Sequence, residues 1–141
     1  MEKFRDEYGY EILETAYPEE DENWRKFRWD SISGLVKKLT KKVKSYNKKV
    51  TAALFPTPEI ARKLVRQNWS EWNLDAFYPM LYNKFYEEGI DWIKMAIGSK
   101  RDETKKPLHG GLYIQDYSVD ELKKAVEILF NCNFTSNAVL F

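Results

Sequence analysis

The chain has 141 residues but only one cysteine and one histidine, and each scarcity removes a class of site. Cys132 cannot form an internal disulfide, and its neighbours do not indicate an activated thiol. With a single imidazole, His109, no histidine-pair metal site exists and no Ser-His-Asp triad is indicated. The pair Gly110-Gly111 lacks the further glycines of a phosphate-binding loop or a dinucleotide fingerprint. We therefore expect neither a metal ion nor a cofactor.

Long apolar runs and an excess of one charge are also missing. No apolar run approaches the roughly 18 residues of a membrane span, and no signal-peptide pattern opens the chain. With 23 basic and 22 acidic residues the formal net charge is +1, which argues against nucleic acid or an anionic membrane as partner. The cellular compartment is not indicated. Hydrophobic residues make up 43% of the chain, which is enough for the core of one domain.

The stretch 72–82 predicts a buried strand around which the rest of the chain is organised. Residues 74–80 are almost continuously apolar, which is typical of a strand covered on both faces in a parallel sheet. Because Pro79 has no N–H to donate, regular pairing should stop near it. The residues that follow would lie at the carboxyl end of the strand, where α/β proteins bind their ligands.

Helical and strand patterns alternate along the chain. Further strands are expected near 50–55, 107–114 and 138–141, with helices near 21–46, 57–68, 83–98 and 118–130. Thr57-Pro58-Glu59 predicts a helix start, and Ser118 with Glu121 matches a capping box. This order predicts one α/β domain over 1–141, with 1–22 as an extension and four strand-helix units on a parallel sheet. It resembles half of a (β/α)₈ barrel, which needs about 250 residues.

Three stretches carry a resemblance to a known family: WRKFRWDSI at 24–32, QNWSEW at 67–72 and DAFYPMLY at 75–82. Together they resemble the carboxyl-terminal half of bacterial glycosyl-hydrolase-like TIM barrels, the family-ten-like group. Members commonly have aspartate at the position of Asn68. The resemblance implies a role in carbohydrate processing. It also implies that the family's aspartate-bearing fourth strand would lie upstream of Met1, so the isolated chain would be incomplete as a catalyst.

Glycoside hydrolysis uses two carboxyl groups about 5–9.5 Å apart, at the carboxyl ends of strands. The candidates are Asp116, after the third expected strand, and Glu59, after the first. Since Glu59 is also explained as the second residue of a helix, no pair stands out. Aromatic and polar side chains that could bind a sugar are expected at the same end of the sheet: Tyr82, Asn83, Tyr113, Gln115 and Tyr117. Packing is the alternative role for each of these aromatic residues.

Three functions remain open at this point: half of a glycoside-hydrolase-like barrel, a non-catalytic carbohydrate-binding or self-assembling module, and a protein-interaction domain unrelated to sugar. The lack of a carboxylate pair favours the second. Two unpaired sheet edges predict a homodimer, unless the amino-terminal segment covers the open face of the sheet. The lysine-rich face of the first long helix could bind phosphate; it carries Lys37, Lys38, Lys41, Lys42 and Lys44. Because no aromatic residues are interleaved on this face, we expect it to be solvated.

Overall fold

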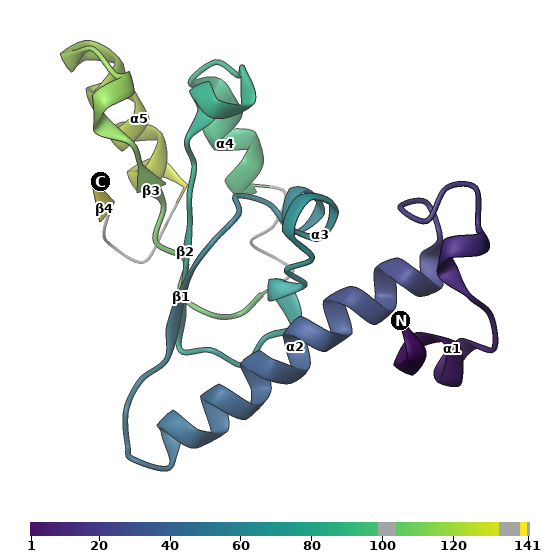
Figure 1. The fold of residues 1–141 in the computed structure, drawn as a ribbon. Coiled ribbons are helices and arrows are strands. Elements are labelled where there is room, and N and C mark those ends of the chain that lie inside the picture. Colours follow the sequence, from purple (N-terminus) through teal and green to yellow (C-terminus); the bar gives the residue numbers. More distant parts are fainter. Residues whose placement is uncertain (99–103, 133–138, 141) are drawn as a thin grey trace.

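The computed structural model describes residues 1–98, 104–132 and 139–140 (Figure 1). The α-helices are α1 (Glu2–Tyr8), α2 (Glu22–Lys44), α3 (Pro58–Val65), α4 (Asp91–Gly98) and α5 (Val119–Asn131). The strands are β1 (Thr51–Leu54), β2 (Ala76–Pro79), β3 (Gly111–Leu112) and β4 (Val139–Leu140). Short 3₁₀ turns lie at 12–14, 69–71, 83–86 and 114–116.

The strands form two separate parallel pairs. β1 and β2 pair in register from Thr51 opposite Ala76 onwards, and β3 pairs with β4. Between the two pairs there are only isolated bridges, at residues 77–108 and 80–111. The prediction of four strand-helix units on one parallel sheet, half of a (β/α)₈ barrel, is therefore wrong. The described part of the chain is a mixed α/β fold with five α-helices and two-stranded sheets.

Pro79 gives a physical reason for this interruption. Upstream of it, the Phe77 N–H donates to the Pro107 carbonyl at 2.9 Å, and the His109 N–H donates to the Phe77 carbonyl at 2.8 Å. The next donor in a parallel ladder would be residue 79, which has no N–H. Bonding resumes only where the Leu81 N–H donates to the Gly111 carbonyl at 2.8 Å. The predicted stop near Pro79 is confirmed, and the same stop divides the expected sheet.

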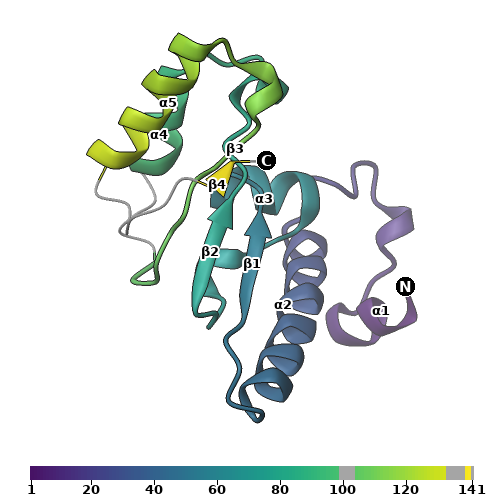
Figure 2. The same cartoon turned by 90° about the vertical axis from the view of Figure 1, so that its left-hand side faces the viewer.

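Helix α2 packs against the β1–β2 pair, as Figures 1 and 2 show. Ile32 and Val36 of α2 contact a buried cluster that includes Leu54 of β1 and Phe77 of β2. The expected helix over 21–46 is confirmed, with Asp21 capping its start by accepting a hydrogen bond from the Trp24 N–H at 2.7 Å. The amino-terminal segment does not cover a sheet face, because α1 lies away from both strand pairs in Figure 1.

A second buried cluster holds α4 and α5 together beside the end of β2, with Leu81, Ile93 and Leu129 in its centre. The single helix expected over 83–98 is divided, because Glu87 adopts left-handed backbone angles (φ 57°, ψ 32°) between the 3₁₀ turn and α4. The two helix starts expected at Thr57 and Ser118 are confirmed, including the complete capping box.

Candidate functional site

Three aromatic side chains gather just beyond the carboxyl end of β2: Tyr82, Phe85 and Tyr113, here named the aromatic cluster. Their ring centroids lie 5.5 Å apart for Tyr82 and Phe85, 5.7 Å for Tyr82 and Tyr113, and 5.5 Å for Phe85 and Tyr113. All three distances fall in the range of favourable aromatic pairs. The Phe85 side chain is 63% exposed, so the cluster reaches the surface.

The local backbone explains why these rings meet. Residues 83–86 form a 3₁₀ turn, in which side chains three positions apart lie on the same side. The Phe85 N–H donates to the Tyr82 carbonyl at 2.9 Å, which brings their rings together. Tyr113 directly follows β3, and the Leu81 N–H bond to the Gly111 carbonyl holds the two strand ends side by side. The cluster therefore depends on the contact between β2 and β3.

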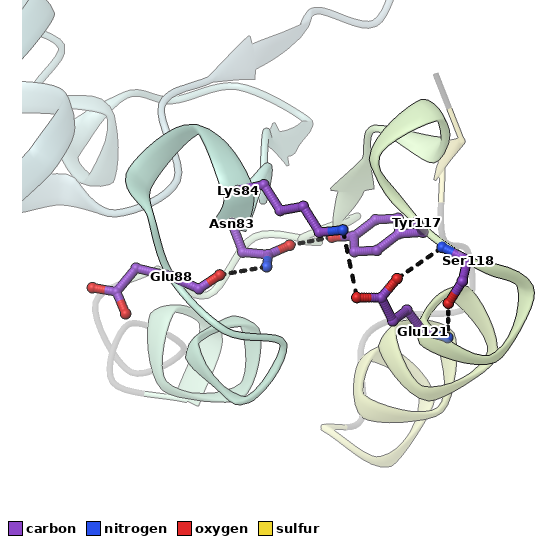
Figure 3. Close-up of polar contacts among 6 residues, drawn as sticks. All are labelled: Asn83, Lys84, Glu88, Tyr117, Ser118 and Glu121. Atoms are coloured by element: carbon purple, nitrogen blue, oxygen red, sulfur yellow. Dashed lines mark hydrogen bonds and ion pairs between the residues drawn. The ribbon is translucent and has the colours of Figure 1, made fainter.

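Asn83 lies beneath this surface and is only 1% exposed. Its side-chain amide donates to the Glu88 carbonyl at 2.7 Å, and its side-chain oxygen accepts a hydrogen bond from the Tyr117 hydroxyl (Figure 3). Both ends of the amide are thus engaged within the protein. Asn83 therefore connects the 3₁₀ turn at 83–86, which includes Phe85, to the segment before α5.

An ion pair between Lys84 and Glu121 also connects the 3₁₀ turn at 83–86 to α5. The Lys84 ammonium lies 3.4 Å from the Glu121 carboxylate and 5.6 Å from the centre of the Tyr117 ring. Glu121 also accepts a hydrogen bond from the Ser118 N–H at 2.8 Å, as Figure 3 shows. This N–H, more than Lys84, holds the pKa of Glu121 below its ordinary value. The Glu121 carboxylate is therefore ionised at neutral pH and engaged in capping α5.

The aromatic cluster has its own polar group at the surface. The Tyr113 hydroxyl donates to the side-chain oxygen of Gln115 at 2.9 Å. Partial burial, with a smaller effect of Tyr113, raises the pKa of Tyr82. The Tyr82 phenol is consequently neutral at physiological pH and can exchange hydrogen bonds with a ligand.

The structure thus brings Tyr82, Tyr113 and Gln115 together at the surface. Asn83 and Tyr117 are joined below them. Of the two carboxylate candidates, Glu59 is exposed on the first turn of α3, after β1. The Asp116 backbone lies in the 3₁₀ turn at 114–116, and its side chain lies outside what the structure describes.

Phe85 is the residue that sequence reasoning missed. A continuous helix was expected from residue 83, and Phe85 was not part of its apolar stripe. Its spacing of three from Tyr82 after a strand-ending proline is the signal that could have identified it.

Metal and membrane sites are not apparent in the part of the chain that the structure describes. No three His, Cys, Asp or Glu side chains there are placed to share a metal ion. None of the helices in the described ranges is long and apolar enough to cross a membrane. Comparisons of the chain with models of protein families, with curated proteins and with solved structures find no match. The resemblance to glycosyl-hydrolase-like barrels therefore stays a prediction.

Proposed function

We propose that this chain is a carbohydrate-binding module that holds its ligand on the aromatic cluster. The observation that carries the proposal is the contact of Tyr82, Phe85 and Tyr113 with one another at an exposed surface. Sugar rings present apolar C–H faces that pack on aromatic rings, and a few polar groups fix their orientation. Gln115, bonded to the Tyr113 hydroxyl, supplies such a group at the edge of the cluster.

Binding is better supported than hydrolysis of a glycosidic bond. Hydrolysis needs two carboxyl groups flanking the scissile bond, one of them protonated. Glu121, close to the cluster, is held ionised by the Ser118 N–H and pairs with Lys84. Glu59 is the second residue of α3 and follows a different strand, β1. A role in carbohydrate processing through a larger catalyst, as the family resemblance implies, remains compatible with a binding surface on this chain.

Self-association through a sheet edge is part of the same proposal. Among the described strands, β1 pairs only with β2, so its outer edge offers unpaired backbone groups. Exposed Thr51 and Ala53 on β1 are small enough to allow a second copy to approach. Light scattering over a range of concentrations tests this, and a constant monomer mass would overturn the homodimer.

The experiment for sugar binding uses the full chain and a panel of soluble oligosaccharides: cello-, xylo-, manno- and chito-hexasaccharides. Isothermal titration calorimetry measures each affinity. Phe85→Ala should weaken the best ligand about fivefold, since an aromatic contact contributes ~1 kcal/mol. The matched control is Phe130→Ala, because Phe130 is 60% exposed on α5 and lies outside the cluster.

Two results would overturn the proposal. One is the absence of binding by every sugar in the panel at millimolar concentration. The other is an equal loss of affinity in the Phe85 and Phe130 variants, because binding would then not depend on the aromatic cluster.

A further inference from the structure

A groove of about 660 Å³ lies between α2 and the segment that leads into β2. Lysines of α2 form one wall, and residues 71–73 form the other. Its size is within the range of sites for small molecules. The aromatic cluster follows β2, whereas this groove lies before β2, so the two are separate places on the fold.

Hydrogen bonds fix the wall opposite α2. The Trp72 ring N–H donates to the Ser33 hydroxyl of α2 at 2.9 Å. The Lys44 ammonium donates to the Asn73 carbonyl at 3.1 Å and lies 3.2 Å from the Asp75 carboxylate. The segment is therefore attached to α2 at two points, and the groove is already formed without a ligand.

The charges in the groove favour an anion. Lys37, Lys41 and Lys44 follow one another at steps of four and three residues, so they project from one face of α2. Asp75 neutralises Lys44. Neither Lys37 nor Lys41 forms an ion pair with any residue in the described ranges, which leaves two ammonium groups for a ligand. Glu71 on the other wall carries a negative charge that would repel an anion, so the anion should lie against α2.

Thr40 is a second and independent sign of a ligand. It lines the groove between Lys37 and Lys41 and is 7% exposed. Its hydroxyl oxygen has no hydrogen-bond partner among the described residues. A buried hydroxyl left without a partner costs about 1–3 kcal/mol, and an oxyanion bound in the groove would supply the missing acceptor. The groove therefore offers two cations and one hydroxyl donor side by side.

The remainder of the lining is largely apolar, from Gly34 and Val36 of α2 and from Trp72. The sequence offered no aromatic residue on the lysine face itself, which had favoured a solvated surface. In the structure, Trp72 is brought to that face from another segment of the chain.

We propose that this groove binds a phosphate monoester whose organic part is apolar. Lys37 and Lys41 match a phosphate that carries close to two negative charges at neutral pH, and Thr40 donates to one of its oxygens. The apolar part lies along Val36 and Trp72.

The test uses phenyl phosphate as probe, titrated into the full chain by calorimetry at about pH 7.5 and low salt. Lys37→Gln combined with Lys41→Gln should weaken binding at least about tenfold, which is ~1.4 kcal/mol. The matched control removes two other charges of α2, through Lys38→Gln and Lys42→Gln, and should change the affinity less than about twofold. Circular dichroism checks that each variant keeps its helices.

Thr40→Val separates binding from folding. It removes the hydroxyl and keeps the shape of the side chain, so phenyl phosphate should bind about fivefold more weakly while thermal stability is unchanged or higher.

Four results would overturn the proposal. Failure of phenyl phosphate to bind at millimolar concentration would remove the site. Equal weakening by the two lysine pairs would indicate a diffuse charge effect. Benzoate binding as tightly as phenyl phosphate would contradict a site built for a dianion, and inorganic phosphate binding equally well would contradict the apolar contacts.

Discussion

Replacing Asn83 by alanine should destabilise the fold, because this buried amide connects the turn at 83–88 with the segment before α5. The substitution removes the hydrogen bond to the Glu88 carbonyl and the one from the Tyr117 hydroxyl. Each such bond contributes about 0.5–1.5 kcal/mol, and the position is only 1% exposed, so solvent does not readily replace them. We therefore expect the free energy of unfolding to fall by about 2 kcal/mol, or roughly 30-fold in the folding equilibrium.

Asn83→Asp refines the same prediction. An aspartate retains the acceptor for Tyr117 but directs a carboxylate oxygen at the Glu88 carbonyl, where the amide had donated. Burial would raise the pKa of this carboxyl in the folded state. A carboxyl with a raised folded pKa makes the native state more stable at low pH, where it is protonated, and less stable as pH rises through that value. Asn83→Asp should therefore be least stable near neutral pH and recover towards about pH 4.

Urea unfolding followed by tryptophan fluorescence measures the free energy of unfolding of both variants. An unchanged slope of this free energy against urea concentration indicates that the fold is intact. Tyr117→Phe completes a double-mutant cycle, which should show a coupling of about 1 kcal/mol with Asn83→Ala. Asn23→Ala, at an exposed position of α2, is the control and should change stability by less than about 0.5 kcal/mol. A loss below about 0.5 kcal/mol for Asn83→Ala, or additive effects in the cycle, would refute the reasoning.

Two further predictions concern a close contact and an ionised group. Gly110→Ala would place a methyl carbon 2.6 Å from the Leu129 Cδ2 atom and should lower the free energy of unfolding by about 1–3 kcal/mol. Gly34→Ala is the control and should raise stability, because Gly34 faces open space on α2. Equal melting temperatures of the two variants would contradict this prediction. The Val50 N–H lowers the pKa of Asp75. Its contribution to stability is then present above about pH 4 and lost as pH falls further, so Asp75→Asn should flatten the acid limb of the stability profile. Identical acid limbs in both proteins would contradict it.

Local features of the fold could be predicted from the sequence because they depend on near neighbours. The cap at Thr57 and the capping box at Ser118 involve side chains that reach only three residues along the chain. The number of strands in a sheet depends on distant pairings. Pro79 was recognised as a ladder stop, but its effect on pairing with residues 107–111 became visible only once that segment was placed beside β2.

The candidate sites follow the same division. Tyr82, Tyr113 and Gln115 were predicted from their positions at the carboxyl ends of expected strands, and their meeting requires only that β2 and β3 end side by side. Phe85 was missed because the left-handed conformation of Glu87 ends the 3₁₀ turn, and a glutamate gives no signal of such a conformation. The groove could not be predicted, because Trp72 approaches α2 from another part of the chain.

Strand β2 separates the two proposed sites, since Trp72 precedes it and Tyr82 follows it. The residues that carry the sites do not overlap, so substitutions in one should act independently of substitutions in the other. Phe85→Ala should therefore leave phenyl phosphate binding unchanged, and removal of the charges of Lys37 and Lys41 should leave sugar binding unchanged. If a substitution at one site changed the affinity of the other site by more than about twofold, the two sites would be energetically coupled. The two ends of β2 would then have to be treated as one coupled site.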